Sequence, residues 1–249
     1  MKLLLTNDDG VNAKGIYALA KELEKKHEVI IVAPDVEKSA SSHSITVRDP
    51  LFVKQVKLEG IKSKAYSVTG TPADCVKIAI DKIVDKNIDM VLSGINNGLN
   101  IGLDVLYSGT VSAAIEAAIN KIPSLAASME VEDGVEGEYE DAARCVSEVI
   151  EKLEDKHMKD DVVFNLNMPM KIEKGIKVCK IGERGYTGYF IEVDSKDEGK
   201  TFQLKGKMSD SHASDTDGYF IKQGYATLTP LHYDLTNFKL LKQVDKIFS

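Results

Sequence analysis

Short apolar runs alternate along the chain with segments in which apolar residues recur every three or four positions. The first run covers residues 3–5, a helical pattern extends from Ile16 to Leu23, and a second run covers residues 28–33. Short continuous runs are typical of buried parallel strands, and the longer period is typical of an amphipathic helix. The pattern therefore predicts a βαβ unit, whose crossover is right-handed in nearly all proteins.

This alternation continues to about residue 180. Further strands are expected at residues 45–56, 64–68, 89–93, 123–129 and 162–167, the last of these closing the core. Helices are expected after Thr71, after Ser108 and from Ala142, and Thr71, Pro72 and Asp74 form a typical helix start. We therefore predict an α/β fold, in which residues 1–180 form a Rossmann-like, mostly parallel sheet with helices on both faces.

The pattern changes beyond residue 180. Tyr189 and Phe190 stand in a stretch punctuated by glycines, residues 202–204 can pair back on it, and residues 225–231 predict one further strand. We predict that residues 181–249 form a C-terminal β-hairpin extension used for oligomerisation. A lid over the functional site is the alternative role.

Composition limits the partners. The 249 residues are 43% hydrophobic and carry a formal net charge of −7, without a block of lysines or arginines. An extended nucleic acid is not an expected partner, because binding its phosphate backbone requires a basic surface. A small phosphorylated ligand remains compatible, since a metal ion can supply the positive charge.

Cysteine usage and hydropathy indicate the compartment. Cys75, Cys145 and Cys179 are far apart and odd in number, which predicts neither a disulfide framework nor a zinc site. Met1 leads directly into an apolar strand, so no signal peptide is expected. No apolar run approaches the roughly 20 residues that span a bilayer. We expect a soluble cytoplasmic protein without a membrane partner.

Candidate chemistry begins at the end of the first strand with Asp8 and Asp9. Ligands of open α/β sheets gather at the carboxyl ends of the strands. Two adjacent carboxylates repel each other unless a proton or a cation lies between them, and a hard divalent cation prefers oxygen ligands. The pair therefore predicts a metal site, with an acidic turn or helix N-cap as the simpler alternative.

Later loops bring more polar groups to the same edge. Ser39 lies in a serine-rich segment after the second strand, and Asn96 lies in a glycine- and asparagine-rich segment after the strand at 89–93. Their oxygens are possible neutral metal ligands, although such residues are also ordinary in connectors. His43 is a candidate substrate contact or a surface histidine. Asp215 and Asp217 are candidate cation ligands, with helix capping favoured.

The helix after Ser108 has small hydroxyl residues at its start. Free backbone N–H groups and the helix dipole make such a start an anion site, so Ser108, Gly109 and Thr110 are candidate phosphate-binding residues. Routine capping is the alternative. A metal edge combined with an anion-binding helix start predicts a phosphate ester as ligand. A dinucleotide is not indicated, because the first loop lacks G-x-G-x-x-G.

Several segments occur in the order found in one known family. They are residues 7–10 (Asn-Asp-Asp-Gly), 39–46, 70–76 (Gly-Thr-Pro-Ala-Asp-Cys-Val), 93–96 (Ser-Gly-Ile-Asn), 107–111 (Tyr-Ser-Gly-Thr-Val) and 227–231 (Thr-Leu-Thr-Pro-Leu). In these segments the chain resembles the SurE family of stationary-phase survival proteins. The resemblance covers nearly the whole chain.

The resemblance implies a metal-dependent nucleotidase that hydrolyses nucleoside 5′- and 3′-monophosphates, with short polyphosphate as a further substrate. It implies one Mg²⁺ or Mn²⁺ ion held by Asp8, Asp9, Ser39 and Asn96. Asp8, Asp9 and Asn96 are then the expected catalytic residues, and Asn96, Ser108, Gly109 and Thr110 the expected phosphate contacts. It also implies a homodimer or homotetramer.

Hydrolysis without a phosphoenzyme is expected. Phosphatases that form a phosphoaspartate use the first Asp of an Asp-x-Asp pair, and that place is occupied here by Asn7. Two rival hypotheses remain. One is a nucleotide-binding regulatory module without turnover. The other is a metal-dependent hydrolase of a different bond, a class that tends to add histidine ligands, whereas no histidine stands beside Asp8 and Asp9 in the sequence.

Overall fold

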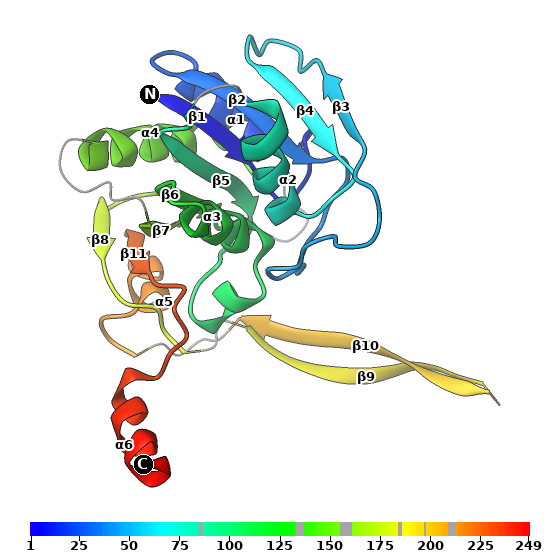
Figure 1. Ribbon diagram of the computed structural model, residues 1–249, viewed down its shortest axis with the longest axis vertical. Helices are drawn as coiled ribbons and strands as arrows, with labels where there is room; N and C mark the ends of the chain where they lie inside the picture. The colour runs from blue at the N-terminus through cyan, green and yellow to red at the C-terminus, as the bar shows by residue number, and fades with distance from the viewer. Residues whose placement is uncertain (85–86, 133–136, 155–160, 184–185, 197, 209–212) are drawn as a thin grey trace.

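The computed structural model describes residues 1–84, 87–132, 137–154, 161–183, 186–196, 198–208 and 213–249. Within these residues a nine-stranded sheet has the order β3-β4-β2-β1-β5-β6-β7-β11-β8 (Figure 1). Neighbouring strands from β4 to β7 are parallel, while β3 and β11 run antiparallel to β4 and β7. The predicted Rossmann-like, mostly parallel sheet is confirmed.

The strands of the large sheet are β1 (Lys2–Thr6), β2 (Glu28–Pro34), β3 (Val53–Val56), β4 (Lys64–Val68), β5 (Met90–Asn97), β6 (Ser124–Met129), β7 (Val163–Met168), β8 (Ile176–Val178) and β11 (Ala226–Leu231). The helices are α1 (Lys14–Leu23), α2 (Pro72–Ile78), η1 (Ala79–Ile83), η2 (Leu103–Leu106), α3 (Gly109–Ile119), α4 (Glu140–Glu154), α5 (Asp217–Ile221) and α6 (Phe238–Phe248). A separate hairpin consists of β9 (Tyr186–Lys196) and β10 (Gly199–Met208).

Helices cover both faces of the sheet, as predicted. Alternate residues of a strand point to opposite faces. Leu3 and Leu5 pack in the cluster that contains the buried residues of α1 and α4, whereas Leu4 packs with those of α2 and α3. All three leucines are at most 1% exposed. The apolar run at residues 3–5 is therefore uninterrupted because both faces of β1 are buried.

The prediction of a strand over residues 45–56 is wrong for most of its length. Only Val53–Val56 form a strand, and this strand pairs with β4 at the edge of the sheet. Val47 is 81% exposed and Phe52 66% exposed. Leu51, Val53 and Val56 pack against the core, but the apolar residues of the first part stay exposed, and that part pairs with no strand among the described residues.

The strand predicted at 89–93 continues further than expected. The main chain is irregular after Ser93, where Gly94 has a φ of 140°, and pairing with β6 then resumes at Asn96 and Asn97. A Cβ on Gly94 would lie 2.2 Å from the carbonyl oxygen of Ala127. The glycine thus permits a close approach to β6, and Asn96 lies at a strand end rather than in a free loop.

The C-terminal part contributes to the large sheet as well as to the hairpin. β11 pairs with β7 and β8, so the expectation that residues 162–167 form the last core strand is wrong. The predicted hairpin is confirmed, and it extends away from the sheet, while α6 lies beyond β11 (Figure 1). The division of the chain at residue 180 stays a prediction.

Candidate functional site

The turn after β1 is closed by the side chain of Asn7. Its Nδ2 donates to the carbonyl oxygen of Gly10 at 2.9 Å, and its Oδ1 accepts from the N–H of Gly10 at 3.2 Å. Gly10 has a φ of 99°, a conformation that glycine adopts readily. Asn7 therefore has a structural role, and it fixes the turn from which Asp8 and Asp9 project.

Asp8 is held by the first turn of α3. The hydroxyl of Thr110 donates to Oδ1 of Asp8 at 2.5 Å, and the N–H of Thr110 donates to Oδ2 at 3.2 Å. Asp8 is 5% exposed, so its negative charge lies in a buried position at the positive end of the helix dipole. The structure thus assigns the hydroxyl and N–H of Thr110 to Asp8, and a direct contact of Thr110 with phosphate stays a prediction.

The start of α3 approaches the β1 turn closely because residue 109 is a glycine. A Cβ on Gly109 would lie 2.7 Å from Oγ of Ser41 and 3.0 Å from Cβ and Oδ2 of Asp8. Ser108 is the N-cap, and its Oγ accepts from the N–H of Val111 at 3.1 Å. The capping role considered for Ser108 is confirmed, and the phosphate roles of Ser108 and Gly109 stay predictions.

The surroundings of Asp8 and Asp9 disfavour the charged forms of both carboxyl groups, which is an electrostatic strain. Burial raises the pKa of Asp8 above its ordinary value. Burial, followed by repulsion from Asp8, raises the pKa of Asp9 from 3.8 to about 6, although the N–H of Asn97 opposes this rise. A bound cation would relieve this strain, because an opposite charge nearby favours the ionised form of a carboxyl group.

Asn96 and Asn97 bring the end of β5 to the acidic pair. The N–H of Asn97 donates to Oδ2 of Asp9 at 3.2 Å. The side-chain Nδ2 of Asn96 donates to the carbonyl oxygen of Gly98 at 2.8 Å, which determines the orientation of its amide group. β1 and β5 are adjacent parallel strands, so both carry these groups at the same edge of the sheet.

Ser39 reaches the same region on the segment after β2. The N–H of Lys38 donates to the carbonyl oxygen of Asp8 at 2.7 Å, and the N–H of Ser42 donates to the carbonyl oxygen of Tyr107 at 3.0 Å. The hydroxyl of Ser39 itself donates to Glu37 at 2.5 Å. The segment is therefore attached both to the β1 turn and to the chain just before α3.

A cavity of about 700 Å³ unites most of these groups. Its polar part is lined by Asp8, Ser39, Asn96, Asn97, Asn100 and Ser108. Its other part is mostly apolar: it is lined by Leu103, Leu106 and Tyr107 and, from the hairpin, by Gly188 and Leu204, with Asp104 as the one carboxylate among them. A cavity with one charged end and one mostly apolar wall suits a small amphiphilic ligand.

The donor set fits a hard divalent cation. The candidate ligands are the carboxylates of Asp8 and Asp9, the side-chain carbonyl of Asn96 and the hydroxyl of Ser39. All four provide oxygen atoms, and Mg²⁺ and Mn²⁺ prefer oxygen ligands. Among the described residues no three His, Cys, Asp or Glu side chains gather with metal-binding geometry. A cation at this edge would therefore depend on the neutral oxygens in addition to Asp8 and Asp9.

Three further candidates from the sequence, His43, Asp215 and Asp217, lie outside the cavity lining, as do Asp9, Gly109 and Thr110. Nε2 of His43 is 2.9 Å from Glu116, whose carboxylate also contacts Lys77 and Asn120. Burial raises the pKa of Glu116, but hydrogen bonds from His43 and Lys77 outweigh this effect, so its pKa lies below the ordinary value. Asp215 pairs with Lys180 at 3.3 Å, and Asp217 begins α5.

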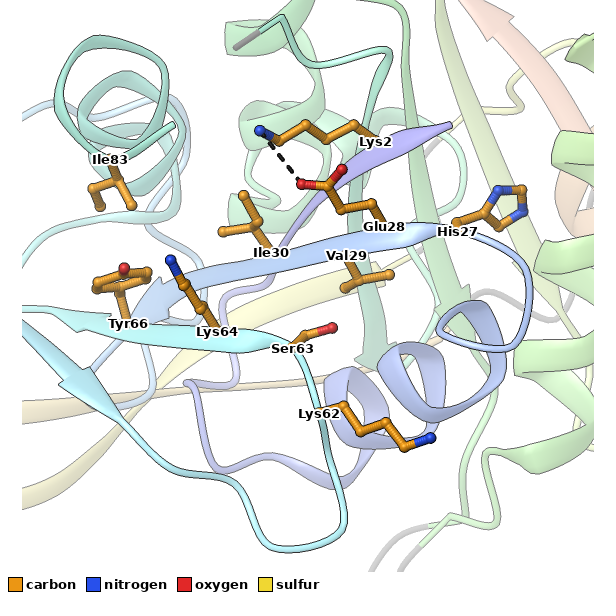
Figure 2. A pocket seen from close by; sticks show the side chains of 10 residues that line it. All are labelled: Lys2, His27, Glu28, Val29, Ile30, Lys62, Ser63, Lys64, Tyr66 and Ile83. Carbon is orange, nitrogen blue, oxygen red and sulfur yellow. Dashed lines mark ion pairs between the residues drawn. The ribbon is translucent and has the colours of Figure 1, made fainter. Parts of the chain in front are cut away.

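A second cavity, of about 480 Å³, lies at the opposite edge of the sheet. Lys2, Glu28 and Lys64 line it at the starts of β1, β2 and β4. Figure 2 shows that Lys2 and Glu28 point toward each other, with Nζ and Oε1 3.6 Å apart. This cavity is remote from the carboxyl ends of the strands and shares no lining residue with the candidate site.

Sequence reasoning missed the apolar wall of the site. Tyr107 stands in a segment that the sequence singled out, but Leu103, Leu106 and Leu204 had no local signal beyond their hydrophobicity. Asn100 was also missed. Its N–H donates to Asn167, its Nδ2 donates to Ser128, and its carbonyl oxygen accepts from Asn165 and Asn167.

The fold and the site define a Rossmann-like α/β protein with an acidic cavity at the carboxyl ends of its parallel strands. A family model described as "Survival protein SurE" matches residues 3–188. The chain belongs to the SurE family.

Similar proteins match over the whole chain. A protein of Clostridium tetani named "5'-nucleotidase SurE" is 53% identical, and one of Clostridium beijerinckii with the same name is 50% identical; 100% of this chain and at least 99% of each relative are covered. The crystal structure of the SurE protein from Aquifex aeolicus matches with a TM-score of 0.86 and 35% identity, with both chains fully covered. Among the described residues, no helix has both the length and the apolar character needed to cross a membrane.

Proposed function

We propose that this protein is a metal-dependent phosphomonoesterase that hydrolyses nucleoside 5′- and 3′-monophosphates to nucleoside and phosphate, and that it also acts on short polyphosphate. The observation that carries the proposal is the cavity at the sheet edge, in which Asp8, Asn96 and Ser108 face an apolar wall. The names of the similar clostridial proteins support the same reaction class.

We assign one divalent cation, Mg²⁺ or Mn²⁺, to Asp8, Asp9, Ser39 and Asn96. Such an ion would neutralise phosphate charge and lower the pKa of the attacking water. The raised pKa values of Asp8 and Asp9 support this assignment, since a carboxylate pair of this kind is better stabilised beside a cation.

The substrate is placed with its phosphate at the polar end of the cavity. Asn96, Ser108, Gly109 and Thr110 are the proposed phosphate contacts, and the positive end of the α3 dipole favours the anion there. The nucleoside then extends along Leu103, Leu106 and Tyr107, whose apolar surfaces suit a base.

Water attacks the phosphorus atom directly, the P–O bond to the nucleoside breaks, the nucleoside leaves with a protonated hydroxyl, and no phosphoenzyme forms. Asn7 cannot act as an aspartate nucleophile, and its amide is already engaged by Gly10. Either Asp8 or Asp9 orients the water or accepts its proton. The protein is further proposed to act as a homodimer or homotetramer, and its cytoplasmic location stays a prediction from the sequence.

A phosphate-release assay tests the proposal. Purified protein is given nucleoside 5′- and 3′-monophosphates and short polyphosphate, with Mg²⁺, with Mn²⁺ or with a chelator. We expect release that requires a divalent ion and that falls by about 100-fold or more in Asp9→Asn, in which one charged oxygen ligand is lost.

Asp49→Asn, which changes an exposed aspartate, is the matched control and should retain activity. Nucleotide binding without phosphate release would instead support a regulatory module. Full activity in the presence of chelator, or full activity of Asp9→Asn, would refute the metal assignment. A phosphoaspartate trapped on the protein would refute direct attack by water.

A further inference from the structure

Asp217 is a buried carboxylate that connects three separate parts of the chain. It is 1% exposed, and it stands at the first position of α5. Its Oδ2 accepts from the N–H of Gly102 at 2.8 Å, and its Oδ1 accepts from the N–H groups of Gly182 and Gly218, each at 2.8 Å. Hydrogen bonds to a charged acceptor are stronger than those between neutral groups.

Two of these N–H groups lie next to or shortly before segments that line the cavity. Gly102 immediately precedes η2, which carries Leu103 and Leu106, and Gly182 lies shortly before the hairpin, which carries Gly188 and Leu204. The N–H of Leu103 also donates to the carbonyl oxygen of Glu183 at 3.0 Å. Asp217 is therefore located where the two sides of the wall meet.

Gly102 and Gly182 suit these hydrogen bonds, because a residue with a Cβ would strain the backbone conformation at one position and crowd the carboxylate at the other. Gly102 has a φ of 56° and a ψ of −143°, a combination that residues with a Cβ rarely adopt. A Cβ on Gly182 would lie 3.2 Å from Oδ1 of Asp217, which is closer than about nine in ten real contacts of a Cβ. Both backbone segments thus approach the carboxylate closely.

The polar end of the cavity has a different anchor. Asn100 is tied to the sheet by Ser128, Asn165 and Asn167, and this network does not include Asp217. The donors to the Asp217 carboxylate are Gly102, Gly182 and Gly218, and none of the proposed metal ligands is among them. A change at Asp217 should therefore disturb the apolar wall and leave the proposed metal ligands in place.

We propose that Asp217 is a positioning residue that sets the affinity of the site for the nucleoside part of the substrate. It does so by fixing η2 against residues 182 and 183, which precede the hairpin. This inference rests on the proposed function, because it concerns the nucleoside end of the same cavity.

The test compares Asp217→Asn with Asp215→Asn. The second substitution makes the same chemical change two residues away, at an exposed side chain that pairs only with Lys180 among the described residues. Each variant is assayed with a nucleoside 5′-monophosphate and with glycerol 2-phosphate, which has no base. Mn²⁺ affinity is measured by calorimetry, and folding by circular dichroism.

For Asp217→Asn we expect KM for the nucleotide to rise about tenfold, which corresponds to roughly 1.4 kcal/mol. The kcat for the nucleotide, the kcat/KM for glycerol 2-phosphate and the Mn²⁺ affinity should stay within about twofold of the unchanged protein. Asp215→Asn should match the unchanged protein throughout. An unchanged nucleotide KM, or an equal loss with both substrates, would overturn the proposal.

Leu103→Ala provides a second test that leaves the carboxylate intact, and it applies even if Asp217→Asn does not fold. A selective rise in nucleotide KM supports the proposed wall, whereas an unchanged value overturns it. If the unchanged protein releases no phosphate from any substrate, the proposed reaction fails. Calorimetric binding of the nucleotide to Asp217→Asn and to the unchanged protein still decides the positioning role in that case.

Discussion

Asp74 illustrates how single side chains hold the surroundings of the site. Its carboxylate accepts from the N–H of Thr71, as part of a capping box at the start of α2, and from the N–H and hydroxyl of Thr46. Thr46 follows the segment that carries Ser39. One side chain therefore caps a helix and also attaches the end of a loop that lines the cavity.

We predict that Asp74→Asn lowers the free energy of unfolding at pH 7 by about 1–2 kcal/mol, because a neutral amide replaces the charged acceptor of the hydrogen bonds from Thr46 and Thr71. Burial raises the pKa of Asp74, but the hydrogen bonds from Thr46 and Thr71 outweigh it, so the folded-state pKa lies below 3.8. The stabilisation is then fully present above the unfolded-state pKa and is lost as the pH falls through the folded-state value.

Urea unfolding at pH 7 and at progressively lower pH measures this effect. The difference between Asp74→Asn and the unchanged protein should shrink as the solution becomes acidic. Asp49→Asn is the control, because Asp49 is exposed. A difference that grows on acidification would contradict the assigned sign.

At the scale of elements, the site depends on the contact between the start of α3 and the turn after β1. Gly109 brings this helix against the β1 turn, and the next residue, Thr110, holds Asp8 with two hydrogen bonds. The helix thus contributes both its dipole and two donors to one carboxylate. The pattern of small residues at this helix start reflects close packing as well as capping.

We predict that Gly109→Ala lowers phosphate release by about tenfold or more, because the added Cβ displaces Asp8 or Ser41 and small displacements at an active site are costly. Overpacking of this kind should also cost about 1–3 kcal/mol of stability. A phosphate-release assay measures the loss of activity, and a thermal unfolding curve measures the loss of stability.

Gly199→Ala is the matched control, since a Cβ at that position meets no atom within 4 Å. Activity of Gly109→Ala equal to that of the control would show that the close approach of α3 is not needed for turnover.

At the scale of the whole molecule, two C-terminal elements expose apolar surface. α6 has no buried residue, and Phe238, Leu241, Ile247 and Phe248 are each more than half exposed. The hairpin exposes Tyr189, Phe190, Phe202 and Leu204 to a similar degree. Exposed apolar surface of this extent is typical of interaction sites, which supports the proposed assembly with further copies of the chain.

We predict that the full chain is a dimer or tetramer in solution and that a chain ending at residue 235 forms a smaller species, because it loses the apolar surface of α6. Light scattering after size-exclusion chromatography measures both masses. A monomeric full chain would refute the assembly, and an unchanged mass after truncation would exclude α6 from the interface.

The sequence by itself determined the sheet architecture and the acidic end of the site. Uninterrupted apolar runs reflect strands buried on both faces, and helix caps such as Thr71 depend on residues only a few positions apart. Because parallel strands share one edge for their carboxyl ends, Asp8, Ser39 and Asn96 could be expected near one another.

The tertiary structure alone decided the partners of these groups. Thr110 is 102 residues from Asp8 in the sequence, and Gly102 is 115 residues from Asp217. The continuation of β5 through Asn97 and the placement of Leu204 in the cavity likewise depend on contacts between distant segments. Local hydrophobic patterns report whether a residue is buried, but the three-dimensional packing of the chain selects the residue against which it is buried.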